Sequence, residues 1–277
     1  MAARSSKTSP PTPDLARLRN LTIEAAHAAG KVLRKYFGKK FTVREKKGAG
    51  LVTNADTEAE AAAIQILKKA GDRFEFLAEE SAPDSSRARS LPGRWILDPL
   101  DGTTNFVHGF PMFCVSIAAE WNGKTVVGVV YHPILDDTYV AVRGQGAFIN
   151  GTRLKVSKTK RLTDSLLTTG FHYRKDELRF EMKAFERLSE IARAIRRPGS
   201  AALDLAYTAR GVFDGFWERN LSPWDIAAGA LLVQEAGGKV TDFSGKPITS
   251  HTHEILATNK NLHTSVRQSI APESCPI

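Results

Sequence analysis

The sequence predicts a mixed α and β fold that forms one compact unit with two lobes. Apolar residues recur at helical spacing near the start and in the second half, whereas short β-type runs dominate between residues 74 and 142. No internal repeat occurs, and no segment is rich enough in Pro, Gly or Ser to separate independent domains. The 277 residues, 42% hydrophobic and 25% charged, are enough for a large core.

Two helices are expected before the first strand. From Asp14 to about Phe37, apolar residues recur at roughly helical spacing. A second helix is expected from Thr57 to Ala70, where alanine and aliphatic side chains share one face. Gly71 can end this helix, because glycine adopts the backbone angles that helix ends require.

Strand-like runs fill the rest of the first half. They cover Phe74 to Ala78, Trp95 to Leu97, Met112 to Trp121, Thr125 to His132 and Thr138 to Val142. The pair Asn122-Gly123 joins two of these runs and predicts a hairpin. The first half should therefore combine helices with a largely antiparallel sheet.

The second half mixes short strands with helices. Strands are expected near Leu166 and over 211–217, and helices at about 176–193, 201–209 and 225–236. We therefore expect a single domain over 14–270, with lobes of about 14–150 and 151–270. Residues 1–13, rich in Ser, Thr, Pro and basic side chains, predict a disordered tail, and 271–277 form a C-terminal tail.

Composition excludes several classes of protein. No stretch approaches the ~20 consecutive apolar residues that span a bilayer, and the N-terminus lacks the apolar core of a secretory signal. There are two cysteines, and Cys114 lies in an apolar run that predicts core packing, so neither a disulfide framework nor a thiolate zinc site is expected. We expect a soluble, cytoplasmic protein with no membrane contact.

The formal net charge is +9 at pH 7, and part of it is concentrated between residues 31 and 47, where Glu45 is the only acid. The basic residues there are Lys31, Arg34, Lys35, Lys39, Lys40, Arg44, Lys46 and Lys47. Such a surface attracts anionic substrates or nucleic acid. A solvated helix face followed by a loop explains the same run equally well.

The chemically informative segment is RWILDPLDGTTNFVHGFP, residues 94–111. An apolar strand is expected to end at Asp98, because Pro99 fixes its own backbone angle and biases the preceding residue towards an extended conformation. Asp98 and Asp101 would then lie together at a tight turn. Two neighbouring carboxylates repel unless protons or cations compensate them, and oxygen ligands of this type suit magnesium.

Gly102, Thr103 and Thr104 follow directly. Gly102 can take backbone angles that a side chain would forbid, and a helix beginning here would offer free backbone N–H groups to an anion. Metal carboxylates and a phosphate site would then lie within one turn of each other. A bare D-x-x-D-G also describes an acidic surface turn before a capped helix.

The string DPLDGTTNF, with WIL before it and FP after it, closely resembles the first signature of the inositol monophosphatase family. Four further segments match that family in the same order and at about the same spacing: LVTNADTEAE (51–60), FLAEES (76–81), GSAALDLAY (199–207) and PWDIAAGALLVQEAGG (223–238). The resemblance extends from the first helix to about Asn259. It implies the layered αβαβα sandwich of the inositol monophosphatase and fructose bisphosphatase type, and a magnesium-dependent phosphatase activity.

The resemblance also implies a site for two to three magnesium ions. Glu79 would bind metal and help to orient the attacking water, and Asp98 would bridge two ions. Leu100 would lend its backbone carbonyl, and the carboxylates of Asp101 and Asp225 would complete the shell of the second ion.

Asp56 and Thr103 match the family's hydrogen-bonded pair that helps to activate the water. Ala78 stands where the family usually has glycine before the paired glutamates, which leaves the acid in place. Taken singly, Asp56, Glu79 and Glu80 are each also explained as solvated acids at the ends of elements.

Asp225 has a local structural explanation as well. Ser222-Pro223-Trp224-Asp225 forms an acceptable capping box, with serine as the cap, proline at the first helical position and the acid at the third. The helix that follows, 226–233, is apolar almost all round and should be buried. Asp225 would then lie in the interior and need a partner, which a metal ion provides.

Other catalytic classes lack their motifs. The seven histidines form no H-E-x-x-H or paired Cys/His pattern, and the sequence has neither a G-x-S-x-G elbow nor a P-loop. His108 lies close to the acidic segment, but a packing role explains it equally well.

The expected substrate-binding residues are Asp101, Gly102, Thr103, Ala201, Glu218 and Asp225. In relatives that act on inositol phosphate, residues matching Ala201 and Glu218 line the ring hydroxyls, and a carboxylate can accept hydrogen bonds from such hydroxyls. Arg219-Asn220 replaces the less polar pair usually found there. Fructose 1,6-bisphosphate, histidinol phosphate and a nucleotide 3'-phosphate therefore stay open as substrates beside inositol monophosphate.

The resemblance further implies lithium sensitivity and a homodimer, and it leaves a second class of function open. Some bacterial relatives are thought to act also as RNA or transcription-complex binding factors. The basic run from Lys31 to Lys47, together with Arg193, Arg196 and Arg197, supports this alternative. The complete set of acids argues against a purely non-catalytic role.

Overall fold

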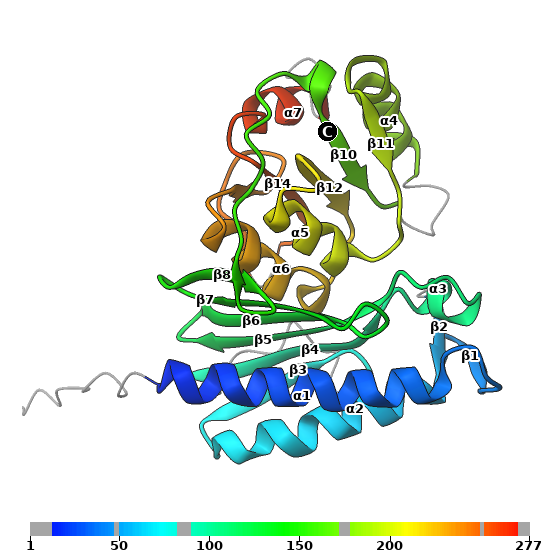
Figure 1. Cartoon of the computed structure of the whole chain (residues 1–277), viewed down its shortest axis with the longest axis vertical. Helices are drawn as coiled ribbons and strands as arrows, with labels where there is room; N and C mark the ends of the chain where they lie inside the picture. Colours follow the sequence, from blue (N-terminus) through cyan, green and yellow to red (C-terminus); the bar gives the residue numbers. More distant parts are fainter. Residues whose placement is uncertain (1–12, 47–49, 82–89, 172–177, 250–251, 271–277) are drawn as a thin grey trace, which may run out of the picture.

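The computed structural model describes residues 13–46, 50–81, 90–171, 178–249 and 252–270, and these form five stacked layers (Figure 1). Helices cover one face of a seven-stranded sheet, further helices separate it from a five-stranded sheet, and a last pair covers the far face. This αβαβα order is the predicted one. No helix within the described ranges is long and apolar enough to cross a membrane.

The first layer consists of α1 (Leu15–Tyr36) and α2 (Asn54–Leu67), which continues into a short 3₁₀ turn (Lys68–Ala70). α2 begins before the predicted Thr57, because Thr53 and Asp56 form a reciprocal capping box at its start. A two-stranded hairpin, β1 (Val43–Lys46) and β2 (Gly50–Thr53), connects the two helices. The predicted tails at 1–13 and 271–277 lie outside the described residues except for residue 13.

The seven-stranded sheet forms the second layer and is antiparallel except where β3 pairs with β4. Its strands are, in spatial order, β3 (Phe74–Ala78), β4 (Gly93–Asp101), β5 (Cys114–Trp121), β6 (Lys124–His132), β7 (Asp137–Val142), β8 (Gly146–Ile149) and β9 (Thr152–Arg153). The hairpin predicted at Asn122-Gly123 joins β5 to β6, and both residues have positive φ, 48° and 80°. The largely antiparallel first half is therefore confirmed.

β4 does not end at Asp98, as the sequence predicted. It continues to Asp101, and its pairing with β5 slips between Asp98, opposite Ser116, and Asp101, opposite Cys114. Three steps along β4 thus match two along β5, which is a β-bulge. Residues three apart on a regular strand point to opposite faces, so the bulge is what lets Asp98 and Asp101 line the same cleft.

The third layer is α5 (Ala201–Arg210) and α6 (Pro223–Glu235), packed between the two sheets. α6 is buried along most of its length, as its all-round apolar sequence predicted. The predicted strand over 211–217 is wrong in its first part. Gly211, at φ 78°, is the left-handed cap that ends α5, and the strand begins only at Gly215.

The fourth layer is the five-stranded sheet, and the fifth is α4 (Leu178–Ile191) with α7 (His263–Ile270). In spatial order the strands are β11 (Ala194–Arg196), β10 (Leu166–Thr169), β12 (Gly215–Arg219), β14 (Glu254–Thr258) and β13 (Lys239–Thr241). Two short helical segments complete the fold, α3 (Thr103–Val107) and the 3₁₀ turn Leu162–Asp164.

Candidate active site

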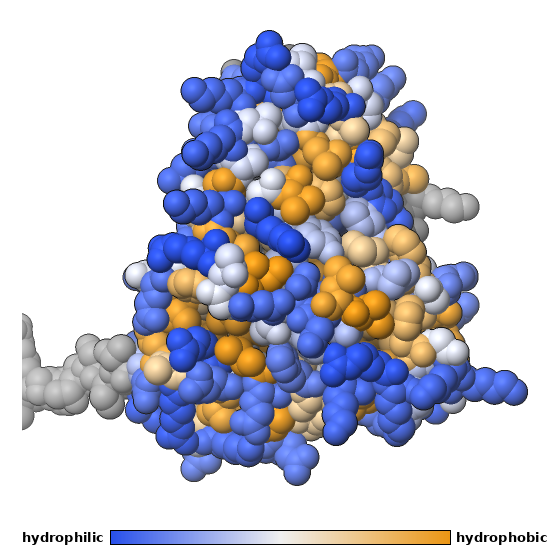
Figure 2. All heavy atoms as spheres, viewed as in Figure 1, coloured by the Kyte–Doolittle hydropathy of each residue, from blue (hydrophilic) through white to orange (hydrophobic). Residues whose placement is uncertain are grey.

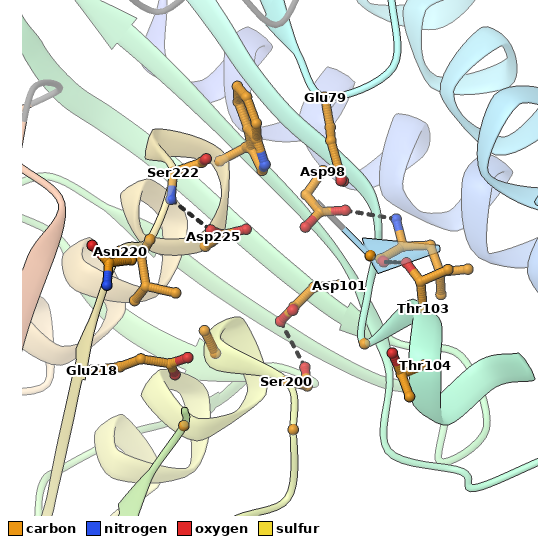
Figure 3. Close-up of a pocket in the computed structure, with 18 of the residues that line it drawn as sticks. Glu79, Asp98, Asp101, Thr103, Thr104, Ser200, Glu218, Asn220, Ser222 and Asp225 are labelled. Atoms are coloured by element: carbon orange, nitrogen blue, oxygen red, sulfur yellow. Dashed lines mark hydrogen bonds between the residues drawn. The ribbon is translucent and has the colours of Figure 1, made fainter. Parts of the chain in front are cut away.

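A cleft of about 530 Å³ is lined by segments from both sheets and from the N-terminal ends of α5 and α6. Figure 3 shows acidic side chains reaching into it from opposite walls. Every residue predicted for the site lines this cleft except Asp56, which lies behind it. The lining members are Glu79, Asp98, Leu100, Asp101, Gly102, Thr103, Ala201, Glu218 and Asp225.

Asp98 is the most crowded acid of the cleft. It lies on β4, is 2% exposed, and accepts the backbone N–H of Leu100 at 2.8 Å. Burial, followed by the negative charges of Glu79, Asp101 and Asp225, raises the pKa of Asp98 well above its usual value. Burial and the neighbouring negative charges thus both disfavour the ionised form of this carboxyl group, and a bound cation would favour it.

Asp101 is tied to the second lobe. Its Oδ2 accepts hydrogen bonds from the Ser200 hydroxyl and from the Ala202 N–H, both at 2.7 Å. Burial raises the pKa of Asp101 to about 6, although these two hydrogen bonds act in the opposite direction. A side chain of the first sheet is thus held by the start of α5.

Gly102 permits the turn that follows Asp101. Its φ is +96°, and a Cβ added here would lie 2.8 Å from the carbonyl oxygen of Met112. Both facts require glycine. The predicted helix does begin next, at Thr103, but it spans only five residues, so its macrodipole is small and the local N–H groups matter more.

Thr103 and Asp56, paired by the resemblance, lie within hydrogen-bond distance. The Thr103 hydroxyl is 3.3 Å from Asp56 Oδ1 and 3.0 Å from the carbonyl oxygen of Leu100. The other oxygen of Asp56 accepts the N–H and the hydroxyl of Thr53, at 2.8 and 2.6 Å. The capping box of α2 therefore holds Asp56 with Oδ1 directed at Thr103.

The capping box predicted at Asp225 is confirmed. Asp225 Oδ2 accepts the N–H of Ser222 at 2.7 Å. The side chain is only half-buried and not deep in the interior as expected, because it stands at the first turn of α6 on the cleft wall.

Glu218 and Arg219 point to opposite faces of the five-stranded sheet. Glu218 faces the cleft so closely to Gly170 that a Cβ there would lie 2.1 Å from its carboxylate. The Arg219 guanidinium instead lies 4.5 Å over the Phe180 ring and 3.6 Å from Glu254. Strand alternation explains this difference. The arginine noted in the sequence thus directs its charge away from Glu218.

Asp204 is an unforeseen acid inside α5. It is 1% exposed, and neither of its oxygens has a hydrogen-bond partner among the described residues. Burial raises the pKa of Asp204 well above its usual value, and the nearby Thr168 hydroxyl, which does not reach hydrogen-bond geometry with either oxygen, offsets this only in part. The sequence does contain a sign of this buried acid, because Asp204 stands within the apolar run ALDLA. Ser200 and Asn105, also unforeseen, lie within segments that carried the resemblance.

Asp204→Asn should stabilise the cation-free protein at pH 8 and change little at pH 4. A carboxyl with a raised folded pKa binds its proton more tightly in the folded state, so its contribution to stability is lost as pH rises through that pKa. Removing the ionisation should gain about 1.4 kcal/mol at pH 8 for each tenfold by which folding tightens proton binding to Asp204, and each kcal/mol is about 2 °C in Tm for a chain of this size. Thermal melts in chelator across pH 4–8 measure this. Parallel pH curves for the two proteins would exclude an ionising Asp204.

The donor set of the cleft fits a hard divalent cation, because it consists of carboxylate and carbonyl oxygens. Among the described residues, no three acidic, imidazole or thiol side chains already form a group that could hold a metal ion. Like charges without a counter-ion repel one another and spread apart. Glu79, Asp98, Asp101 and Asp225 nevertheless line one cleft, and a cation bound among them would offset the like charges that raise the pKa of Asp98.

Comparison with known proteins gives the class and the family. A model of the inositol monophosphatase family matches residues 14–273. A Rhizobium meliloti protein named Inositol-1-monophosphatase is 42% identical, over 91% of this chain and 96% of its own length. A Pseudomonas aeruginosa protein named Nus factor SuhB is 40% identical, over 93% and 97%. The structure of extragenic suppressor protein suhB from Bartonella henselae matches with a TM-score of 0.85 and 42% identity, over 92% and 98%.

The five-layered fold, the acidic cleft and these relatives define a phosphatase. More narrowly, the chain belongs to the inositol monophosphatase family.

Proposed function

We propose that this protein is a magnesium-dependent phosphomonoesterase that hydrolyses inositol monophosphate to inositol and phosphate. The supporting observation is the buried Asp98, crowded by three further acids in a cleft that also presents Glu218. Relatives named Inositol-1-monophosphatase, at 40–42% identity, favour the same substrate. A homodimer and a cytoplasmic location remain predictions.

The cations would be held by Glu79, Asp98, Asp101 and Asp225 together with the carbonyl of Leu100. Bound there, two to three magnesium ions would neutralise the phosphoryl charge, lower the pKa of the attacking water and stabilise the departing oxygen.

The protein's own groups orient the attacking water. The Thr103 hydroxyl can donate its one hydrogen bond to Asp56 or to the nearer Leu100 carbonyl, and if a cation binds that carbonyl, Asp56 is the acceptor that remains. The oxygen of Thr103 can then accept a hydrogen bond from water in the cleft. Glu79 lines the same cleft and would accept the proton that the water loses as it attacks. Asp56 then acts by fixing the direction of the Thr103 O–H bond.

Substrate would lie between the α3 segment and β12. Gly102 and Thr103 line the cleft together with Asp101 and Asp225, and their backbone N–H groups would hold the oxygens of a phosphoryl group there. Glu218 and Ala201 line the opposite wall, where the Glu218 carboxyl exchanges hydrogen bonds with polyol hydroxyls.

The direct test is phosphate release by the purified protein with and without magnesium. A panel of inositol 1-phosphate, fructose 1,6-bisphosphate, histidinol phosphate and a nucleotide 3'-phosphate separates the alternative substrates. We expect magnesium-dependent turnover with the highest kcat/KM on the inositol ester. A clear preference for another member would replace the substrate while keeping the chemistry, whereas no release with any member would remove the proposal.

Glu218→Gln should raise KM for inositol 1-phosphate by roughly tenfold, because a site built to pair with hydroxyls loses about 1–3 kcal/mol when one partner changes. The kcat and the magnesium dependence should change little, because Glu218 lies across the cleft from Asp98. Steady-state kinetics over the substrate panel measure both parameters. Unchanged discrimination, or loss of the magnesium response, would contradict the assignment of Glu218 to recognition.

Lithium should inhibit turnover at fixed magnesium. Lithium is close to magnesium in size but carries half the charge, so it can bind the same oxygens while giving less charge stabilisation. Phosphate release should be followed across lithium concentrations, with chloride-matched sodium and potassium to correct for ionic strength on a protein of charge +9. Equal responses to lithium and sodium would count against the cation site around Asp98, Asp101 and Asp225.

A second candidate function is binding to RNA or a transcription complex. Relatives from Pseudomonas aeruginosa and Escherichia coli carry the name Nus factor SuhB. On this chain the basic residues Lys31, Arg34, Lys35, Lys39 and Lys40 are all exposed, and Figure 2 shows mainly hydrophilic side chains on the face where α1 runs. RNA binding should then weaken steeply with salt and fall further in Lys39→Glu/Lys40→Glu, while phosphate release is retained.

A further inference from the structure

We propose that Ser200 and Asn105 are positioning residues that fix Asp101 so that it presents only Oδ1 to a cation in the cleft. The inference rests on the proposed function, because it assigns the orientation of one carboxylate of that site. Neither residue would touch the cation. Both would act through Asp101.

Ser200 and Ala202 both donate to the same oxygen of Asp101, and the backbone N–H of Ala201 is a further donor that acts to lower the pKa of this carboxyl group. Oδ2 accepts the Ser200 hydroxyl and the Ala202 N–H, each at 2.7 Å, and Figure 3 shows the bond to Ser200. A carboxylate oxygen has about two lone-pair directions, so these two donors occupy Oδ2. The weakly donating thiol of Cys114, at 3.8 Å, approaches the same oxygen. Oδ1 is therefore the atom available to the cleft.

The hydroxyl of Ser200 does not serve its own helix. Serine at the N-cap usually accepts an N–H of the first helical turn, and Ser200 occupies the N-cap of α5. Its side chain nevertheless makes no capping hydrogen bond. Asp101 accepts the N–H of Ala202 in its place. An acid from the first sheet thus caps a helix of the second lobe, and Ser200 has its hydroxyl free to hold that acid.

Asn105 holds the turn that leads to Ser200. Its side-chain nitrogen donates to the carbonyl oxygens of Met112 at 2.6 Å and Pro198 at 2.8 Å, with that of Gly199 at 3.3 Å. Since all three partners are acceptors, the amide must present its NH₂ group to them. A Cβ on Gly199 would lie 3.2 Å from this amide. Asn105 thus links the α3 segment, which follows Asp101 in the chain, to the turn before α5, whose first residues donate to Asp101.

Ser200→Ala should weaken cation binding by about tenfold, since losing a group that orients a ligand typically lowers metal affinity 10–100-fold. Without the hydroxyl, the Asp101 carboxylate can rotate. Ser200→Thr keeps the hydroxyl and should bind nearly as well as the wild type, and Asn105→Ala should weaken binding in the same direction as Ser200→Ala. Binding of Mn²⁺ to the substrate-free protein, read from the electron paramagnetic resonance signal of free Mn²⁺, measures affinity without turnover.

Ser165→Ala is the matched control, because Ser165 is also fully buried and its hydroxyl donates to the Leu162 carbonyl at 2.7 Å, away from the cleft lining. Asp101→Asn is the second arm and tests the ligand itself. Weak binding by Ser200→Ala, with Ser200→Thr and Ser165→Ala near wild type, supports the proposal. If Asp101→Asn loses Mn²⁺ but Ser200→Ala does not, the positioning role is overturned while the proposed function stands. Equal losses in Ser165→Ala overturn it as well, and a wild type without Mn²⁺ affinity overturns both.

Discussion

Asp98→Asn should lower phosphate release by at least ~10²-fold, the size of effect seen when one charge-stabilising group is removed from an active site. The negative charges of Glu79, Asp101 and Asp225 all act on Asp98. Removing the charge of Asp98 should therefore weaken cation binding by the whole group. The fold should survive, because asparagine has the same shape and can still accept the Leu100 N–H.

The same variant should melt at a higher temperature than the wild type in chelator at pH 7.5. The raised pKa of Asp98 means that folding favours its protonated form, so its ionisation reduces stability as pH rises, and asparagine cannot ionise. Activity assays and melts of the same preparations measure both effects. Asp164→Asn is the control, because it also removes one negative charge, but from a surface ion pair with Arg161. A folded, active Asp98→Asn protein would remove Asp98 from the mechanism.

Gly102→Ala should reduce activity by a similar factor while leaving most of the fold intact. A left-handed φ costs a non-glycine residue roughly 1–3 kcal/mol, and the new methyl group would meet the Met112 carbonyl at 2.8 Å. Backbone atoms cannot move aside as a flexible side chain can. The segment must therefore shift, and it carries Asp101 on one side and Thr103 on the other.

Gly109→Ala separates strain from collision. Gly109 also has a positive φ, +72°, but a Cβ there would have no atom within 4 Å. We expect it to lose some stability and keep its activity, measured by kcat/KM and thermal melts beside Gly102→Ala. Equal loss of activity in both variants would show that backbone strain alone, and not the displacement of Asp101 and Thr103, accounts for the effect.

Local sequence rules predicted most of the fold. Helical periodicity located α1 to within a residue or two at each end, and the Asn122-Gly123 turn fixed a hairpin. Both depend on neighbours in the chain. The five-layered order came from the resemblance and not from periodicity, since the stacking of two sheets depends on contacts between distant segments.

The sequence predicted those site residues that fall within motifs. It could not predict features of the site that depend on contacts between distant segments. The β4 bulge was missed because the register of a strand is set by its partner. The sequence could not predict the direction of Arg219, because the face that this side chain occupies depends on the position of its strand in the sheet. Ser200 meets Asp101 only after both lobes fold, so no local pattern links them.

The arrangement of layers has a consequence for synthesis of the chain on the ribosome. The seven-stranded sheet is complete by Arg153, and one of its faces, including Ile96, Ala118 and Val130, is covered mainly by α5 and α6. Because α6 runs to Glu235, that apolar face stays bare while the intervening residues are made. Uncovered apolar sheets in partly made chains are prone to aggregation. Slowing translation between residues 153 and 235 should therefore reduce the yield of soluble protein.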